Sequence, residues 1–363
     1  MTMHTLADAG DVAGKKVLMR TDFDVPLDGD GNIAEEFRII RQRPALEELL
    51  SRGARVLLIA HSSAAPSFEP LLPHLERLLG VQIRFCRNFA EVHAYWDDKG
   101  TVALLENLRS DAGEEANSDA YARRLVEGCD LFVNNAFAVC HRAHASVVTV
   151  PTLIPSYAGP LVEEEVAQLT KAVQAPAEGK IVYMGGAKAS TKVPVIRHLI
   201  GKAQRIAVGG VLANDIFKVL GRDIGASRVD EHAEELLAGL DIHDPRLVLP
   251  TDSVTDDGRI ADIGPESAAA FAALARGATT IIWNGPMGEC EDARFAAGTN
   301  ALARAIAESG AWTVVGGGDT IAAVARAGLL EKFSVVSTGG GSMLAFLGGE
   351  QLPGLAALGY SAS

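Results

Sequence analysis

The sequence predicts an α/β protein built from two Rossmann-like, three-layer domains, each with a parallel sheet, joined by a helix. The chain has 363 residues, which is more than one hydrophobic core usually supports. Short β-branched apolar runs alternate along it with segments in which apolar residues recur at helical spacing. The strand-like runs are apolar throughout rather than at every second position. This indicates strands covered by helices on both faces, as in parallel sheets.

The first half contains strand-like runs separated by helix-like segments. The expected strands cover residues 16–20, 55–61, 82–86, 102–108 and 130–136. Between them, helical spacing marks segments such as RQRPALEELLSRG, PLLPHLERLLG and SDAYARRLVEG. We therefore expect a first domain over residues 1–157.

A stretch rich in Pro and small residues, PTLIPSYAGP at 151–160, interrupts this pattern. EEEVAQLTKAVQ follows with helical spacing, and we expect one connecting helix over 158–175. The alternation then resumes, with expected strands at the start of KIVYMGGAK, RIAVGG, RLVLPTD, TTIIWNG, WTVVGGG and FSVVSTGGG. This predicts a second α/β domain over residues 176–347.

Composition narrows the class of protein and of partner. The net charge of −13 disfavours nucleic acid or an anionic membrane surface as a partner. No apolar run approaches the about 20 residues that a membrane helix needs. The four cysteines are scattered, and the N-terminus lacks the basic and apolar regions of a secretory signal. We expect a soluble, cytoplasmic protein that acts on small molecules.

Nearly every expected strand of the second half runs into glycine. Ligands of such sheets collect at the carboxyl ends of the strands, and glycine lets backbone N–H groups approach an anion closely. Tight turns between strands and helices also use glycine, but the repetition favours a bound nucleotide, although no P-loop or GxGxxG pattern occurs. The candidate nucleotide-binding residues in these turns are Gly185, Gly186, Gly209, Gly210, Asn284, Pro286, Gly316, Gly317 and Gly318.

Charged residues accompany two of these turns. Lys188 and Lys192 are spaced i and i+4 where a helix should begin, so they could share one face toward a phosphate, or form a solvated pair. Asp319 in GGGDT could hold Mg²⁺ directly or through water. It could equally cap the following helix, and the two roles are compatible.

The first half ends its strands in cations instead of glycine. Any single Arg is most simply a surface salt bridge, but Arg at several strand ends indicates a bound anion, since guanidinium suits phosphate and carboxylate. One domain for a nucleotide and one for a small anion predicts phosphoryl transfer with domain closure. The charged residues concerned are Arg20, Asp22, Asp24, Arg38, Arg109, His141, Arg142 and His144.

These stretches occur together, in order, in one known family. The sequence resembles phosphoglycerate kinase over essentially its whole length. The matching motifs are RTDFDVPL, EEFRI, LLENLR with GEE, NAF, HRAHAS, GGAKASTK, GGVLAN, DIGP, WNGPMG, GGGDT, STGGG and LPGLAAL. The resemblance implies a two-lobed glycolytic kinase that moves phosphate reversibly between ATP and the carboxylate of 3-phosphoglycerate, giving ADP and 1,3-bisphosphoglycerate. It further implies Mg²⁺, hinge closure, a monomer, and a C-terminal tail over 348–363 that packs back on the first domain.

The resemblance also implies roles for individual residues. Arg38 and Lys192, with Gly318, form the implied catalytic set, and Lys188 contacts the nucleotide phosphates. Asp319 serves the metal–nucleotide complex, Thr320 a phosphate, and Glu291 the ribose hydroxyls. The implied acid-binding residues are Asp22, Asp24, Arg38, His61, Arg109 and Arg142. A carboxylate is already a deprotonated nucleophile, so no general base is needed.

The first domain departs from the family in several places. Family members follow the His of RVLLIAH with Leu-Gly-Arg-Pro and a longer loop, whereas here the loop reads Ser-Ser-Ala-Ala-Pro over 62–66 and lacks the Arg. A charged hydrogen bond is worth about 1.5–3 kcal/mol, so binding of phosphoglycerate could weaken by about one to two powers of ten. Asp24 replaces an Asn, and its charge would repel an anion unless Arg20 or another cation neutralises it.

Smaller departures are Ser110–Asp111, Asn135 and Ala138–Val139, whereas the motifs of the second domain are nearly intact. Three interpretations follow. The chain is a working, divergent phosphoglycerate kinase, a kinase for a different carboxylate, or a nucleotide-binding protein that has lost catalysis.

Overall fold

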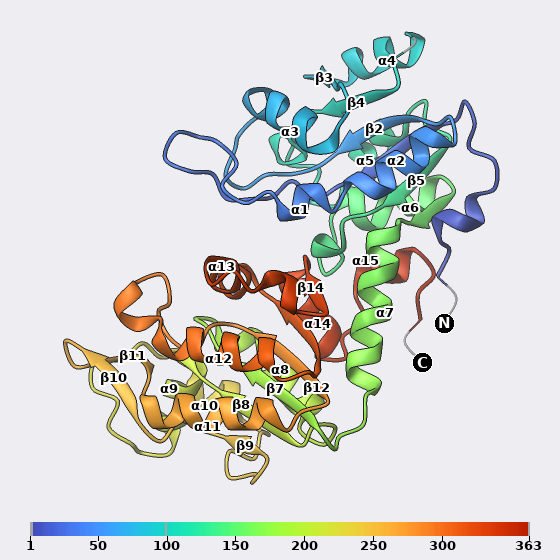
Figure 1. The fold of residues 1–363 in the computed structure, drawn as a ribbon. Coiled ribbons are helices and arrows are strands. Elements are labelled where there is room, and N and C mark those ends of the chain that lie inside the picture. The colour runs from blue at the N-terminus through green and yellow to red at the C-terminus, as the bar shows by residue number, and fades with distance from the viewer. Residues whose placement is uncertain (1–2, 99, 362–363) are drawn as a thin grey trace. The chain divides into compact units, whose positions relative to one another are not determined.

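A computed structural model describes residues 3–98 and 100–361 (Figure 1). The chain divides into two compact units. Unit 1 extends to Val166 and also contains the segment from Gln351 onward, and unit 2 is Ala167–Glu350. We expected a first domain up to 157, a connecting helix over 158–175 and a second domain over 176–347. The division between the two units falls inside helix α7 (Pro160–Gln174), which lies within the range expected for the connecting helix.

Unit 1 contains a six-stranded, wholly parallel sheet in the order β3-β4-β2-β1-β5-β6. Its register aligns Arg20 at the end of β1 with Ile59 of β2 on one side and Asn134 of β5 on the other. The carboxyl ends of three central strands are therefore level. The strands are β1 (Lys16–Arg20), β2 (Arg55–Ile59), β3 (Arg84–Cys86), β4 (Val102–Leu105), β5 (Leu131–Asn134) and β6 (Ser156–Ala158).

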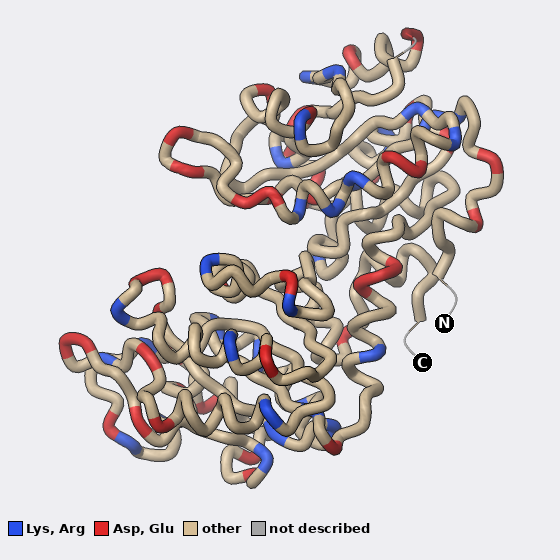
Figure 2. Tube along the Cα trace, in the orientation of Figure 1, with Lys and Arg blue, Asp and Glu red and all other residues tan. Residues whose placement is uncertain are grey.

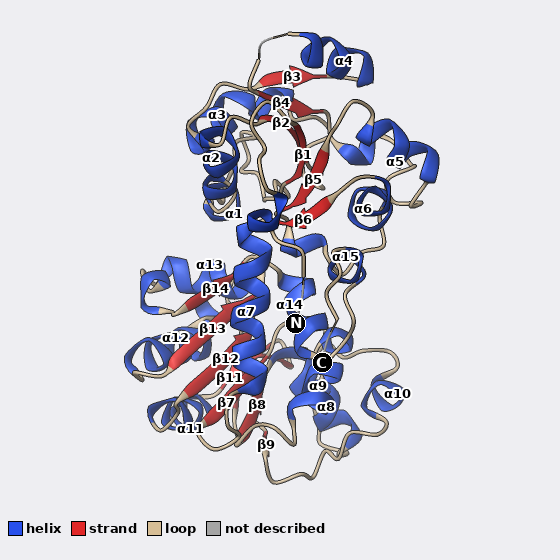
Figure 3. Cartoon of the chain, turned by 90° about the vertical axis from the view of Figure 1, so that its right-hand side faces the viewer, coloured by secondary structure: helices blue, strands red, loops and turns tan. Residues whose placement is uncertain are grey.

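Successive residues of these strands enter two different cores, because side chains alternate across a sheet. Val17 and Met19 pack with residues of α2 and α3, whereas Leu18 packs with residues of α4 and α5. Helices therefore cover both faces, which makes the three layers visible in Figure 3. The helices are α1 (Phe37–Ile40), α2 (Arg43–Ser51), α3 (Leu72–Leu79), α4 (Phe89–Asp97), α5 (Asp119–Val126) and α6 (Val150–Leu153).

Unit 2 contains a second six-stranded parallel sheet, in the order β14-β13-β12-β7-β8-β9. This is the doubly wound order, in which the chain starts in the middle at β7 and later restarts beside it at β12. The strands are β7 (Lys180–Met184), β8 (Arg205–Val208), β9 (Leu247–Val248), β12 (Thr280–Asn284), β13 (Trp312–Gly316) and β14 (Val335–Ser337).

Helices cover both faces of this sheet as well (Figure 3). One core of this unit joins strand residues such as Tyr183 and Trp283 to residues of α11 and α12, including Phe271. The predicted α/β class with two parallel sheets is confirmed. The helices are α8 (Val193–Leu199), α9 (Gly210–Val219), α10 (Ala233–Leu237), α11 (Pro265–Arg276), α12 (Ala297–Glu308), α13 (Gly318–Arg326) and α14 (Gly340–Leu347).

Three strands were not expected from the sequence. β6 lies in the Pro-rich stretch that we interpreted as a break, and it is paired to β5. β10 (Ser253–Asp256) and β11 (Arg259–Ile263) form a separate antiparallel hairpin. Three of the four residues of β10 are polar, so it lacks the apolar run by which the other strands were recognised.

The C-terminal segment returns to unit 1. Helix α15 (Pro353–Ala357) follows the last residue of unit 2, and the Gly354 N–H donates to the Cys140 carbonyl at 2.9 Å. The His4 N–H donates to the Leu358 carbonyl, which ties the described ends of the chain together. Among the described residues, no helix combines the length and apolarity needed to cross a membrane. Acidic and basic positions are interspersed over both units (Figure 2).

The turn after β12 imposes a severe steric requirement on unit 2. Gly285 has φ +89°, and a Cβ there would lie 2.1 Å from the Gly185 carbonyl oxygen. We expect Gly285→Ala to lower the free energy of unfolding by about 2–4 kcal/mol, from backbone strain and overlap with main-chain atoms. Urea unfolding monitored by Trp fluorescence measures this.

Gly277→Ala is the matched control, since a Cβ at Gly277 meets nothing within 4 Å and its φ is negative. Equal effects of the two substitutions would contradict the steric account.

Candidate active site

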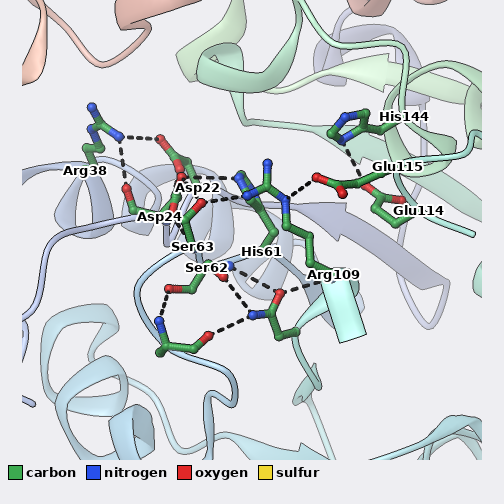
Figure 4. A network of polar contacts seen from close by, with 12 residues as sticks. Asp22, Asp24, Arg38, His61, Ser62, Ser63, Arg109, Glu114, Glu115 and His144 are labelled. Carbon is green, nitrogen blue, oxygen red and sulfur yellow. Dashed lines mark hydrogen bonds and ion pairs between the residues drawn. The ribbon is translucent and has the colours of Figure 1, made fainter. Parts of the chain in front are cut away.

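The carboxyl edge of the first sheet gathers the acid-binding residues expected from the sequence. Asp22 and Asp24 follow β1, His61 follows β2, and Arg109 lies in the turn after β4. Arg38 comes from α1, and Figure 4 shows its guanidinium directed at Asp22 and Asp24. The structure brings these five residues into one network of polar contacts, although they span 87 positions of sequence from 22 to 109.

Arg38 is anchored to the end of β1. Its Nη1 donates to the Asp24 carbonyl at 3.0 Å and lies 4.0 Å from Asp22 Oδ2, while Nε lies 3.8 Å from Glu35 Oε2. Asp22 is 1% exposed, and burial raises the pKa of its carboxyl group, an effect that the positive charge of Arg38 opposes. The guanidinium is thus oriented by the backbone while remaining partly exposed.

His61 lies between a cation and an anion. Its Nδ1 is 3.0 Å from Arg20 Nη2, and because guanidinium can only donate, Nδ1 accepts. Nε2 then carries the hydrogen and lies 3.3 Å from Asp24 Oδ2. Burial lowers the pKa of His61 to about 4, against a partial opposing effect of Asp24. The ring is therefore neutral at pH 7, with one defined tautomer.

The Asp24 carboxylate is stabilised by hydrogen bonds rather than by the cation that we expected. Arg20 does not contact it directly, since that guanidinium binds His61, Ser146 Oγ and the Thr21 carbonyl. Burial would raise the pKa of Asp24, but contacts with His61 and Ser63 outweigh it and hold the pKa well below its ordinary value. The Asp24 carboxyl group is consequently ionised, and its oxygens contact His61 and Ser63.

Arg109 and Arg142 complete the cationic edge. Arg109 Nη1 donates to Ser63 Oγ at 2.6 Å, and its Nε lies 3.0 Å from Glu115 Oε1. Arg142 is half-buried in the segment after β5, and its positive charge adds to burial in lowering the pKa of His144. Arg142 thus lies beside the same edge, but outside the contacts drawn in Figure 4.

Sequence reasoning missed the residues that support this edge. Glu114, which is fully buried, accepts from the Ser146 N–H and from Ser146 Oγ, and the same hydroxyl accepts from Arg20 Nε at 3.0 Å. Asn107 was missed as well, although it binds the loop after His61. Both residues lie in the motifs LLENLR and GEE, but nothing local assigns them this role, because Ser62, Ala65 and Ser146 lie dozens of positions away.

In unit 2, the glycine turns meet where the strand order reverses, between β7 and β12. The Gly185 N–H donates to the Asn284 carbonyl at 3.0 Å, and the Gly186 N–H to the Pro286 carbonyl at 2.8 Å. A Cβ at Gly210 would lie 2.7 Å from the Gly186 nitrogen. The absence of side chains therefore lets three segments converge at the place where doubly wound sheets bind ligands.

A pocket opens beside these turns. Its lining includes Gly186, Gly210, Pro286, Met287, Glu291 and Asp319, of which Met287 was not expected. Asn284 and Thr320 lie behind it, since Thr320 Oγ1 accepts from the Gly285 N–H at 2.8 Å. Gly209 precedes α9, and Gly316, Gly317 and Gly318 lead from β13 into α13.

Two local expectations for the charged residues were wrong. Lys188 and Lys192 do not share a helical face, because residues 189–191 form a 3₁₀ turn and α8 begins only at Val193. Lys188 is exposed, whereas Lys192 is buried, and burial lowers its pKa, against the opposing charge of Asp319. Asp319 is not the helix cap, since Gly317 holds that position and Asp319 lies in the first turn.

Lys192 is still close to the glycine turns. A Cβ on Gly186 would lie 3.7 Å from its Nζ. Buried Asp262, also on the pocket wall, accepts from the Gly298 N–H at 2.8 Å, and burial raises its pKa to about 6. The pocket wall thus carries three exposed carboxylates, those of Glu289, Glu291 and Asp319, and the buried ammonium group of Lys192 lies close to Gly186 of its lining. Carboxylates beside an ammonium group suit a polyphosphate that is bound with a cation.

The neutral His61 makes stability depend on pH. The pKa is about 4 in the folded chain against an ordinary 6.5, so its contribution is complete above pH 6.5 and is lost as the pH falls to 4. We expect His61→Asn to remove about 3 kcal/mol of this pH-dependent change in unfolding free energy, measured by urea unfolding at pH 7 and at pH 4. His232→Asn, at an exposed histidine, should keep the wild-type dependence. A wild-type dependence in His61→Asn would show that another group is responsible.

Comparison with known proteins bears on the whole chain. The family model described as phosphoglycerate kinase matches residues 6–350. Phosphoglycerate kinase of Acaryochloris marina is 40% identical, and that of Moorella thermoacetica 39% identical, each over 99% of both chains.

Solved structures agree with the sequence comparison. Phosphoglycerate kinase from Coxiella burnetii superposes with a TM-score of 0.82 at 32% identity, covering 99% of both chains. That from Pyrococcus horikoshii OT3 gives 0.87 at 29% identity, covering 98% of both chains. With a family model over most of its length and relatives at this identity over almost all of it, the chain belongs to the phosphoglycerate kinase family.

Proposed function

We propose that the chain is a working phosphoglycerate kinase, transferring a phosphoryl group reversibly between ATP and the carboxylate of 3-phosphoglycerate. The observation that carries this is the convergence of Arg38, Arg109 and His61 at one sheet edge of unit 1. A glycine-lined pocket at the corresponding edge of unit 2 complements it. Phosphoryl transfer needs alignment and positive charge rather than covalent help, and these two edges offer both.

In the acid site, Arg38 acts on the transferring phosphoryl group, and its hydrogen bond to the Asp24 carbonyl supports a fixed orientation. Arg109 and Arg142 bind the substrate's anionic groups. Asp22, Asp24 and neutral His61 line the site between them. Both carboxylate oxygens of Asp24 already contact His61 or Ser63, so the repulsion between Asp24 and a bound anion is reduced.

In the nucleotide site, Gly185, Gly186, Gly209 and Gly210 admit the phosphates close to the backbone. The buried ammonium group of Lys192 acts on the transferring group, together with the backbone of Gly318. Glu291 binds the ribose. The remaining contacts, to the phosphates and the base, come from Lys188, Thr320, Asn284, Pro286, Gly316 and Gly317.

Asp319 is the residue that would hold Mg²⁺. It is exposed on the pocket wall in the first turn of α13, beside the turns proposed for the phosphates. Mg²⁺ prefers one or two carboxylates together with phosphates and water, which fits this donor set. When bound, the ion would offset the negative charge of the phosphates. Helix α7, which both units share, is the proposed hinge.

We further propose that the protein acts as a cytoplasmic monomer. The four cysteines are all free, which suits a reducing compartment. Sedimentation at working concentration tests the monomer.

One observation favours a second candidate, a kinase for a different carboxylic acid. The loop over 62–66 carries no cationic side chain, and the Asp24 carboxylate lies beside it. A coupled assay with MgATP over a panel containing 3-phosphoglycerate, glycerate and other small carboxylic acids separates the two. We expect the highest kcat/KM for 3-phosphoglycerate. ADP binding without turnover of any acid would instead indicate a protein that has lost catalysis.

The proposal assigns Arg38 to the reaction rather than to the fold. We expect Arg38→Ala to lower kcat by about 10²–10³-fold or more, since a positive group facing the transferring phosphoryl is lost. ADP affinity, measured by calorimetry, should change little. Arg43→Ala, which removes a surface guanidinium paired with Glu47, is the matched control. Wild-type turnover in Arg38→Ala would contradict the role assigned to it.

A further inference from the structure

The loop that connects β2 to the following 3₁₀ turn is built without a cation but is held rigidly. Asn107 Nδ2 donates to the Ser62 carbonyl at 2.8 Å and to the Ala65 carbonyl at 2.9 Å. The Ser62 Oγ accepts from the Ala65 N–H at 3.0 Å. Asn107 Oδ1 also accepts from the Arg109 N–H at 3.1 Å. One buried side chain therefore fixes both the loop and the backbone of Arg109.

Ser63 joins this loop to two charged side chains. Its N–H donates to Asp24 Oδ1 at 2.6 Å, and its Oγ lies 3.3 Å from Asp24 Oδ2. Arg109 Nη1 donates to the same Oγ at 2.6 Å. A hydroxyl group has one hydrogen and two lone pairs, so Ser63 can donate to Asp24 while it accepts from Arg109. Figure 4 shows Ser63 between these two residues.

Because Asp24 is ionised, the hydroxyl group of Ser63 has one preferred orientation. With a carboxylate on one side, the Ser63 hydrogen points to Asp24 and the oxygen lone pairs face the guanidinium. An Asn at this position could present its amide hydrogens to Ser63 instead, which would leave the hydroxyl orientation undefined. Asp24 and Ser63 thus act as a pair.

Arg109 keeps donors for a ligand. A guanidinium has five N–H groups, and the hydrogen bond to Ser63 engages one of them, on Nη1, while Glu115 faces Nε at 3.0 Å as an ion pair without a hydrogen bond. Glu115 is 59% exposed, so an anionic ligand can displace it, whereas Ser63 is fixed through the loop backbone. The contact with Ser63 is therefore the one that sets where Arg109 points.

We propose that Ser63, oriented by Asp24, is a positioning residue that aims Arg109 at the phosphate group of the acid substrate, on the side away from the reacting carboxylate. This rests on the proposed function and deepens it. The loop after β2 determines specificity for a phosphorylated acid through an uncharged hydroxyl group, and the cation comes from the turn after β4.

The test compares Ser63→Ala with Ser67→Ala in the full-length protein. Ser67 lies in the same segment, but its Oγ binds Glu106 at 2.6 Å rather than Arg109. We expect Ser63→Ala to raise the KM for 3-phosphoglycerate by about fivefold, with kcat and the KM for MgATP unchanged. The reason is that the substitution removes only the hydrogen bond that orients the guanidinium of Arg109. Ser67→Ala should leave all three constants unchanged. Ser63→Thr, which keeps the hydroxyl at an exposed position, should restore the wild-type KM.

An Arg109→Ala background provides the decisive check. There, adding Ser63→Ala should cause no further loss in 3-phosphoglycerate affinity, measured by calorimetry, because the group it positions is gone. Equal KM values for Ser63→Ala and Ser67→Ala, or additive losses in the Arg109→Ala background, would overturn the inference while leaving the kinase activity standing. If the wild type binds but does not turn over 3-phosphoglycerate, the proposed function fails. The Ser63 dependence of binding then still decides the positioning role.

Discussion

A fully buried guanidinium, that of Arg20, holds the carboxyl edge of the first sheet together. It is the last residue of β1, and it contacts His61 after β2 and Ser146 in the segment after β5. Removing such a charge from water is costly unless every donor finds a partner. Ser146 accepts from Arg20 and in turn donates to the buried carboxylate of Glu114, which supplies the opposite charge. Because Arg20 can only donate, it also sets the tautomer of His61, and through it the contact with Asp24. The buried Arg20 thus fixes the positions of His61 and Asp24 at the surface of the acid site.

The second unit obeys a different constraint, which is space rather than charge. Its glycine turns bring main-chain atoms of β7, β8 and β12 so close that a methyl group would overlap with them. The result is a set of main-chain segments that pack against one another through N–H to carbonyl hydrogen bonds, with the buried ammonium group of Lys192 close by. The carboxyl edge of the first sheet is therefore organised by charged side chains, and that of the second by closely packed backbone.

Much of this could be predicted from the sequence, because strands buried on both faces are visible as apolar runs and the residues after them are local in sequence. The sheets, the glycine turns and the cation cluster followed from that pattern. The loop after His61 did not, since its shape depends on Asn107, 45 positions away. The i, i+4 spacing of Lys188 and Lys192 was misleading for a local reason, because a 3₁₀ turn delays the start of α8. β10 was missed because three of its four residues are polar and only Val254 is apolar, so the stretch resembles a loop.

The return of the C-terminal segment to unit 1 has a consequence for biosynthesis. Unit 2 is one continuous stretch of chain, whereas unit 1 needs α15, with Leu352, Leu355 and Leu358 buried in it, to be complete. On the ribosome, the part that is translated first must therefore wait until α15 has been synthesised before its packing closes. Unit 2 can finish folding earlier, so the order of maturation is the reverse of the order of synthesis.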